Sequence, residues 1–382
     1  MTAVELMLSL IRSAVTGKQQ EVIDSINNET LEEIYKIAET HNIAHIIAFA
    51  LSKNQKLGND EISKKFSRAM LLAVYRYEQK NYEYQRICKF FEEEKIKFLP
   101  LKGSVIRKYY PEEWMRNSCD IDILVQEERV EEIVALLTQK LNYKSDGKRK
   151  SHDILLHTPG DVHLELHFNI ISGSYAFNRV LSRVWDFARP VEDKENHYQL
   201  SDEFLYFHII SHAAYHFLRG GCGIRPIFDI WLLKNNLNLD AKKLLPLLKE
   251  ADLEKFAVEL EHLSNVWANG YPHNETTKMM EQYILSGGVY GTMENRVAIN
   301  EHSQNKLKYF FHRVFMPYEA MKKYYKILDR APVLYPFFHI VRWFRIIFTN
   351  KDSAFVELKQ NQTISTGKVD SLSEMRKRLN LR

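Results

Sequence analysis

The stretch that decides the fold is Phe98-Leu-Pro-Leu-Lys-Gly-Ser104, followed after a spacer by Cys119-Asp-Ile-Asp-Ile-Leu-Val125. The second run has the pattern of a β-strand, in which successive side chains point to opposite faces of a sheet. Asp120 and Asp122 therefore share one face, and the aliphatic residues share the other. Two parallel carboxylates in an apolar strand repel each other and destabilise it unless a cation lies between them. The pattern predicts a divalent-metal site.

A third carboxylate is expected on a later strand of the same small sheet. After an expected turn at Asp146-Gly147, the run Asp153 to Thr158 predicts a strand, and Pro159-Gly-Asp161 predicts a hairpin to the next one. In this next run, Val162 to Ile170, polar and apolar residues alternate, and the polar face carries Glu165. An exposed sheet face with miscellaneous polar residues is the simpler alternative, but the neighbouring Asp-x-Asp strand favours a site.

The Gly103-Ser104 step is interpreted as a turn that faces phosphate. Glycine lets the backbone approach a phosphate group, and the start of a helix presents free N–H groups to it. Lys102 and Arg116 flank this step and could neutralise phosphate oxygens, the arginine with a two-pronged grip. Oxygen ligands without cysteine favour Mg²⁺ or Mn²⁺ over zinc, and two such ions can hold a phosphoryl group in transfer.

The composition is that of an ordinary folded protein. The chain has 382 residues, enough for two or three domains, of which 45% are hydrophobic and 27% charged. A net charge of +4, spread along the chain, argues against a long nucleic-acid footprint. Three cysteines without CxxC spacing argue against structural zinc and favour a reducing compartment, so we expect a cytoplasmic protein. We also expect no signal peptide and no membrane span.

Helical periodicity surrounds the short strands. The predicted fold class is α+β, a small mixed sheet flanked by helical lobes. The expected segments are an N-terminal helical lobe (1–94), an α/β core with the carboxylate strands (95–198), a C-terminal helical domain (199–350) and a loosely held polar tail (351–382) with a helix near 372–379. Within the third segment, residues 309–348 are aromatic and basic. We expect a buried helical packing unit there, with membrane-surface binding as the alternative.

Three histidines recur every four residues on one face of a predicted helix, namely His208, His212 and His216. Two histidines one turn apart can share a zinc ion, but three along two turns do not converge on one ion, and no HExxH is present. Packing, or a wall of a neighbouring pocket, is therefore favoured. The run Gly220-Gly-Cys-Gly223 lacks the Lys-Ser/Thr of a phosphate loop and is interpreted as a turn, after which Arg225 and Asp229 open the next helix.

Together these features resemble the DNA polymerase beta type nucleotidyltransferase superfamily and, within it, an uncharacterised bacterial branch. The residues that carry the resemblance are Leu101-Lys-Gly103, Tyr110-Pro111, Arg116, Asp120-Ile-Asp122 and Glu165-Leu-His167. Shorter similarities extend it over most of the chain, at Ala38-Glu-Thr-His41, from His208 to Asp229, and at Phe315-Met-Pro317. The interval from Gly103 to Asp120 is longer than is usual in the superfamily, which leaves the phosphate contacts open.

The resemblance implies transfer of an NMP group from an NTP, expected to be ATP, to a hydroxyl acceptor, with release of pyrophosphate. It implies two Mg²⁺ or Mn²⁺ ions on Asp120, Asp122 and Glu165, with Glu165 also helping to take the acceptor's proton. The nucleotide would be held by Lys102, Gly103, Ser104 and Arg116, the last steadying either the triphosphate or the loop before Asp120. The acceptor would be a small molecule, a saccharide or a peptide, and candidates for its pocket are His167, His208, His212, Arg225 and Asp229.

Two other interpretations stay open on the sequence. One is a kinase-like phosphotransferase on the same scaffold that moves the γ-phosphate to a peptide or small-molecule hydroxyl, because the same metals serve either transfer. The other is a non-catalytic or toxin-like regulatory module that acts on RNA ends, since a modest net charge does not argue against a short nucleic-acid contact.

Overall fold

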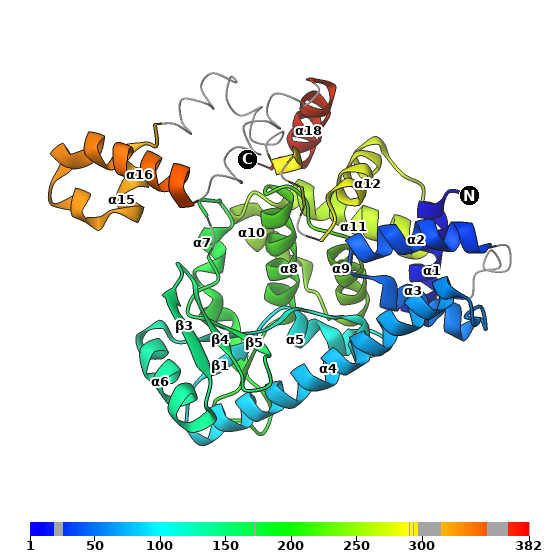
Figure 1. Ribbon diagram of the computed structural model, residues 1–382, viewed down its shortest axis with the longest axis horizontal. Coiled ribbons are helices and arrows are strands. Elements are labelled where there is room, and N and C mark those ends of the chain that lie inside the picture. Colours follow the sequence, from blue (N-terminus) through cyan, green and yellow to red (C-terminus); the bar gives the residue numbers. More distant parts are fainter. Residues whose placement is uncertain are drawn as a thin grey trace.

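Helices surround one small mixed sheet in the computed structural model (Figure 1), which describes residues 1–18, 26–171, 173–289, 291–292, 294–296, 315–349 and 366–381. The predicted α+β class is therefore confirmed. The boundaries of the expected domains stay a prediction.

The N-terminal part is helical, as predicted. Its helices are α1 (Ala3–Thr16), α2 (Asn28–Thr40), α3 (Ala44–Lys53) and α4 (Glu61–Glu93). Asp60 caps α4 by accepting the N–H of Ser63 at 3.1 Å, which satisfies one of the free donors at a helix start. The 33 residues of α4 join two hydrophobic cores, because Phe66 packs in the larger core of the helical lobes and Phe91 packs under the sheet.

The five-stranded sheet has the order β1-β2-β5-β4-β3. Its strands are β1 (Phe98–Pro100), β2 (Asp120–Val125), β3 (Lys144–Arg149), β4 (Asp153–His157) and β5 (His163–His167). β2 pairs antiparallel with β1 and parallel with β5, and β4 and β5 form the predicted antiparallel hairpin. The chain around Asp146-Gly147 is an edge strand with a shift of register rather than a turn, so that prediction is wrong. A bulge accommodates Gly147 at φ +67° without ending the strand.

The two faces of β2 differ as the alternation predicted. Ile121, Ile123 and Val125 are fully buried in the core beneath the sheet. The same core contains residues of α6 (Val130–Leu141) and of the second half of α4. Asp120 and Asp122 occupy the other face of the strand. The aliphatic side therefore anchors the carboxylates on a rigid support.

Between the strands of the sheet lie the short helix α5 (Gly103–Ile106) and the 3-10 turns η2 (Arg107–Tyr109), η3 (Glu113–Met115) and η4 (Glu127–Arg129). The chain after the sheet is mainly helical, and its short elements are α7 (Asn178–Leu181), the ribbon β6 (Ala188–Pro190) and β7 (Tyr198–Leu200), and the 3-10 turns η5 (Val184–Phe187), η6 (Lys326–Asp329) and η7 (Pro332–Leu334). Its longer helices are α8 (Asp202–Phe217), α9 (Arg225–Asn236), α10 (Ala241–Glu250), α11 (Glu254–Asn269), α12 (Glu275–Gly287), α15 (Tyr318–Tyr324), α16 (Tyr335–Thr349) and α18 (Thr366–Leu379).

The N-terminal and C-terminal helices share one hydrophobic core. Residues of α1 and α11 belong to the same cluster of buried side chains. Nε of Arg12 also donates to the carbonyl oxygen of Trp267 at 2.7 Å, which ties α1 to α11. The two helical segments that flank the sheet in the sequence therefore pack side by side in space.

The aromatic and basic segment differs from expectation where it is described. The helices α15 and α16 lie at one edge of the molecule, away from the sheet (Figure 1). The side chains of Val333, Phe337 and Phe344 are exposed by 90%, 56% and 59%, so the predicted burial of this segment is wrong for these residues. Residues 309–314 of the predicted unit lie outside the described residues.

The end of the chain is held more firmly than predicted. Residues 351–365 of the expected polar tail lie outside the described residues, but α18 packs on α11 and α12. Met375 and Leu379 are fully buried there, so the tail is not loosely held at this helix. Among the described residues, no helix combines the length and the apolar character needed to cross a membrane. The expected cytoplasmic location stays a prediction.

Candidate active site

Two carboxylates predicted from separate stretches of sequence lie directly opposite each other. Because β2 and β5 are parallel neighbours, Asp122 is paired in register with Glu165, and Asp120 with His163. Oxygen atoms of Asp122 and Glu165 and a ring nitrogen of His167 all lie within 4.8 Å of one another. This set of ligands fits a divalent cation. Mg²⁺ and Mn²⁺ both bind carboxylate oxygens, and Mn²⁺ also tolerates an imidazole ligand.

Asp122 is buried, and one of its carboxylate oxygens already accepts hydrogen bonds from two side chains. Nζ of Lys102 lies 2.7 Å from its Oδ1, and Nε2 of His167 lies 2.9 Å from the same oxygen. Burial alone would raise the pKa of Asp122, but Lys102 and His167 outweigh it and hold the pKa well below its usual range. The same His167 nitrogen lies 3.5 Å from Oε2 of Glu165, and this hydrogen bond lowers the pKa of Glu165. Both carboxylates are therefore ionised at neutral pH.

Asp120 shows that the site lacks positive charge. Burial, followed by repulsion from Asp122 and Glu165, raises the pKa of Asp120 to about 6. The nearby Lys102 ammonium only partly compensates three carboxylates. A divalent ion at this point would supply the missing charge, so the residues present fit the metal that the sequence pattern predicted.

Lys102 reaches Asp122 from an unusual backbone conformation. Its φ is +46° and its ψ is −122°, a region that residues with a side chain rarely adopt. Lys102 caps the single helical turn α5, and its side chain is only 23% exposed. Although burial works against the charged form, Asp122 raises the pKa of Lys102. The strained backbone therefore directs an ammonium group at the carboxylates.

The backbone at Gly103-Ser104 packs more tightly against the neighbouring loop than the sequence suggested. A Cβ atom at Gly103 would lie 3.1 Å from Cβ of Ser118, so glycine is needed for the approach of the following loop. The N–H of Ser104 donates to the carbonyl oxygen of Leu101, and the N–H of Val105 to that of Lys102. These amides are not the free donors that the sequence pattern suggested, because the short turn uses them itself. The Ser104 hydroxyl lies 3.5 Å from Nη2 of Arg107.

Arg116 is held by the helical domain. Its Nε and Nη2 donate to the two carboxylate oxygens of Asp229 at 2.7 and 2.8 Å, and the Tyr110 hydroxyl donates to the same aspartate at 2.8 Å. Arg225 donates to the backbone carbonyl of Asn117 in the same loop. The structure thus brings together the predicted residues Arg116, Arg225 and Asp229. Their hydrogen bonds fix the loop that precedes Asp120 to α9, and we call this group the Arg116 and Asp229 clamp.

A cavity of about 250 Å³ joins these groups. We call it the carboxylate cavity, and its lining includes Lys102, Gly103, Arg116, Ser118, Asp120, Asp122, Glu165, His212, His216, Arg225 and Asp229. The predicted residues His167, His208 and Ser104 are not part of this lining.

Comparison with known protein families shows one match. A family model described as an uncharacterised nucleotidyltransferase matches residues 27–269, well over half of the chain. The chain belongs to this family. The match includes the paired carboxylates, the Lys102-Gly103-Ser104 step, and the Arg116 and Asp229 clamp, but it ends before Phe315-Met-Pro317. No curated protein and no solved structure gave a significant match.

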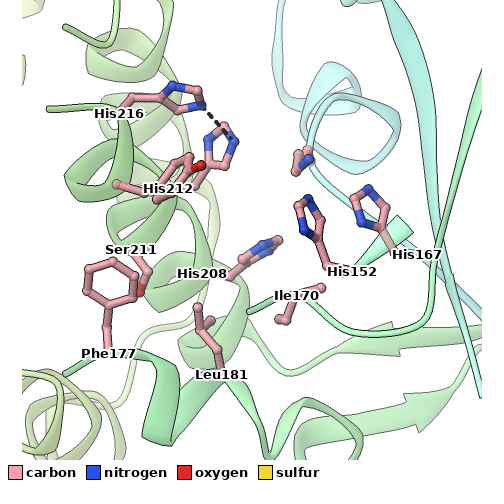
Figure 2. A pocket seen from close by; sticks show the side chains of 11 residues that line it. His152, His167, Ile170, Phe177, Leu181, His208, Ser211, His212 and His216 are labelled. Carbon is pink, nitrogen blue, oxygen red and sulfur yellow. Dashed lines mark hydrogen bonds between the residues drawn. The ribbon is translucent and has the colours of Figure 1, made fainter. Parts of the chain in front are cut away.

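A second cavity lies beside the first, between α8 and the sheet (Figure 2). Its volume is about 180 Å³. We call it the histidine cavity, and its lining residues are Lys102, His152, His167, Ile170, Phe177, Leu181, His208, Ser211, His212, Tyr215 and His216. The two cavities share Lys102, His212 and His216. The histidine stripe on α8 is therefore a pocket wall, the interpretation favoured from the sequence.

Several residues of the candidate site were not predicted from the sequence. His152 lies in the loop before β4 and enters the histidine cavity from the sheet, while Ser211 and Tyr215 reach it from α8. Their proximity to the histidine stripe was the only available signal for the last two. His157, Asp161 and His163 form a further ligand-type cluster around the β4–β5 hairpin, which no sequence motif marks.

Proposed function

We propose that this nucleotidyltransferase moves an NMP group from an NTP, ATP being the expected one, to a hydroxyl acceptor and releases pyrophosphate. The observation that carries the proposal is the pairing of Asp122 with Glu165 across β2 and β5, with Asp120 on the same face. Three carboxylates gathered beside a buried lysine match the requirements of metal-assisted phosphoryl chemistry. Family membership supports the general class of transferase.

Asp120, Asp122 and Glu165 would hold Mg²⁺ or Mn²⁺, as two ions in the full site. When bound, these ions neutralise charge on the phosphoryl group and favour ionisation of the acceptor hydroxyl. The raised pKa of Asp120, caused by burial and by the neighbouring carboxylates, supports this role because a cation would relieve the repulsion.

Side chains of the protein would accept the proton of the acceptor, contact the phosphates and position the loop before Asp120. Glu165 is ionised and 23% exposed at its side chain, so it can accept the proton of an acceptor hydroxyl. Lys102 and the Gly103-Ser104 step would contact the phosphates. Arg116 is engaged by Asp229 through both oxygens, and this favours the role of steadying the loop before Asp120 over direct contact with the triphosphate.

Labelled ATP tests the proposal directly. The full chain would be incubated with Mg²⁺, a mixture of hydroxyl compounds, and ATP labelled at either the α or the γ phosphate. We expect α label on an acceptor together with pyrophosphate. Transfer of γ label would instead identify a kinase-like phosphotransferase on the same scaffold.

Variants assign the reaction to the site. Asp120→Asn and Glu165→Gln should each lower the rate by about 100-fold or more, the usual scale for loss of a positioned proton acceptor or metal ligand. Glu128→Gln, an exposed carboxylate on the same domain, is the matched control and should leave the rate unchanged. Full activity in Glu165→Gln would refute the assignment of the site.

A further inference from the structure

We propose that the histidine cavity is the acceptor subsite and that it takes an uncharged polyhydroxy compound about the size of a monosaccharide. This inference rests on the proposed nucleotidyl transfer and adds to it the class of the second substrate. It is carried by the position of the cavity, by the chemistry of its lining and by its size.

The position of the cavity suits an acceptor. His167 lines the cavity, and its Nε2 lies 2.9 Å from Asp122 and 3.5 Å from Glu165. Lys102 and His212 line both this cavity and the carboxylate cavity. A hydroxyl bound against His167 would therefore lie one side chain away from the carboxylates, where a phosphoryl group would be attacked.

The charge of the lining argues against a cationic acceptor. Among the described residues, no Asp or Glu side chain lines the histidine cavity. The Lys102 ammonium at its edge is already paired with Asp122 at 2.7 Å. An ammonium group in the cavity would lose its hydration without a carboxylate in direct contact, which is costly. An acceptor that carries amino groups is therefore disfavoured.

The imidazoles of α8 favour hydroxyls over anions. Burial lowers the pKa of His208 to about 3 and that of His216 to about 4, so both rings are neutral at pH 7. A neutral imidazole has one N–H donor and one acceptor nitrogen, and a hydroxyl group likewise donates and accepts. An anion would gain at most one N–H donor, and no positive charge, from each neutral ring. Hydroxyl groups thus match this wall better than a carboxylate or phosphate does.

Two of the lining imidazoles have unused hydrogen-bonding capacity. In the described part of the chain, Nδ1 of His208 and Nδ1 of His167 are buried without a partner. Both residues are 3% exposed. An unsatisfied buried polar group costs about 1–3 kcal/mol, and such groups call for an explanation such as a ligand or an ordered water. A hydroxyl in the cavity would satisfy either nitrogen once the ring turns it toward the ligand.

Size and shape complete the match. The cavity volume of about 180 Å³ corresponds to roughly six liquid water molecules, below the range of most drug-sized ligand pockets. Figure 2 shows Phe177, Leu181 and Ile170 on the sides away from the α8 histidines His212 and His216. A compact ring with hydroxyls on its rim and C–H groups on its faces could contact both kinds of wall.

Three sugars with the same ring, of which two carry one charged substituent in place of a neutral one, test the inference on the full chain without nucleotide. Glucose, glucosamine and glucuronate would be titrated at pH 7, and binding would be measured by calorimetry. We expect the dissociation constant of glucose to be at least about tenfold lower than that of either charged analogue. Equal or tighter binding of glucosamine or of glucuronate, or no binding of any of the three, would overturn the assignment.

Cavity-filling variants locate the binding. His208→Phe and, at the partly exposed rim, Ile170→Trp should each weaken glucose binding by about tenfold or more. Ile327→Trp, at a residue 51% exposed and outside the cavity, is the matched control and should bind like the unmodified chain. Glucose binding that survives in a folded Ile170→Trp variant would place the subsite elsewhere.

The failure of this inference is distinguishable from the failure of the proposed function. If glucose binds in the cavity but α label from ATP never reaches an acceptor, only the transfer is refuted. If α label is transferred while none of the three sugars binds, only the subsite is refuted. Binding of Mn²⁺ and ATP, measured in parallel for each variant, reports on the carboxylate cavity independently.

Discussion

Arg116 and Asp229 lie 113 residues apart in the chain and form a two-pronged ion pair with N–O distances of 2.7 and 2.8 Å. The side chains are only 13% and 2% exposed. Arg116 belongs to the loop that leads into the Asp120-Ile-Asp122 strand, and Asp229 belongs to α9. This pair joins the carboxylate strand to the helices that form the opposite wall of the site.

Asp229→Asn should destabilise the protein by about 3–5 kcal/mol, because removal of one partner leaves the buried Arg116 guanidinium without its counter-charge. Urea unfolding measures this free energy. Asp161→Asn is the matched control, since Asp161 is 93% exposed at its side chain and should change stability by about 0.5 kcal/mol or less. A loss below about 1 kcal/mol for Asp229→Asn would show that the pair is not the buried link described.

Lys102→Met should tighten the binding of Mn²⁺ to the nucleotide-free protein by about tenfold or more, which is about 1.4 kcal/mol. The reason is that the Lys102 ammonium lies 2.7 Å from Asp122 and competes with a metal for the same carboxylate. Electron paramagnetic resonance of free Mn²⁺ gives the affinity. Lys150→Met is the comparison, because Lys150 is 51% exposed, lies 3.9 Å from Glu165 and should have a smaller effect. Weaker Mn²⁺ binding in Lys102→Met would contradict the competition.

His45 should make the protein less stable in mild acid. Burial, helped by the charges of Arg225 and Lys80, lowers the pKa of His45 from 6.5 to about 4, although Nε2 donates to the carbonyl oxygen of Met115 at 2.9 Å. Between pH 6.5 and 4 the unfolded chain binds a proton at this residue and the folded chain does not. The free energy of unfolding therefore falls as the pH falls through this window, by about 3 kcal/mol for this group.

The variant His45→Gln isolates that contribution, since the glutamine amide can still donate to Met115 but does not titrate. The stability difference between pH 7 and pH 4, measured by urea unfolding, should shrink by about the same 3 kcal/mol. Other buried histidines such as His208 and His216 act in the same direction, so some acid sensitivity should remain. An unchanged difference would show that His45 is protonated in the folded protein.

Met375→Ala on α18 should destabilise the protein by about 2–5 kcal/mol, because the side chain is fully buried in the core and its removal leaves a cavity. Chemical unfolding measures the loss. Lys377→Ala on the same helix removes an exposed side chain and should change stability by about 0.5 kcal/mol or less. If both variants behaved alike, α18 would not be part of the folded core.

The local pattern of polar and apolar residues was sufficient to predict the strands that carry the carboxylates. The alternation at Asp120 to Val125 predicted the bounds of β2, and the polar face of the later strand placed Glu165 correctly relative to its aliphatic neighbours. Period-two alternation is a property of neighbouring residues, so it is readable without knowing the fold. The edge strand β3 was missed because its residues are polar and include Gly147, whose turn signal dominates locally.

The side-chain partners could not be read in the same way. The sequence left open whether Arg116 steadies the triphosphate or the loop before Asp120, and only the packing of α9, which places Asp229 against it, favours the loop. The short α5 turn uses N–H groups that the pattern suggested were free. Exposure of apolar residues at η7 and α16 also departs from expectation, since an apolar residue is equally compatible with a buried or an exposed helix face.

The sequence by itself determined the family, the α+β class and the three carboxylates of the candidate site, because these depend on short motifs and on strand periodicity. Only the tertiary structure decided that Asp122 faces Glu165 in register, that Lys102 pairs with Asp122, and that the α8 histidines line a second cavity beside the carboxylates. Those relationships arise from the parallel pairing of β2 with β5 and from the docking of α8 and α9 on the sheet. Such contacts join residues far apart in the chain, and no local pattern specifies them.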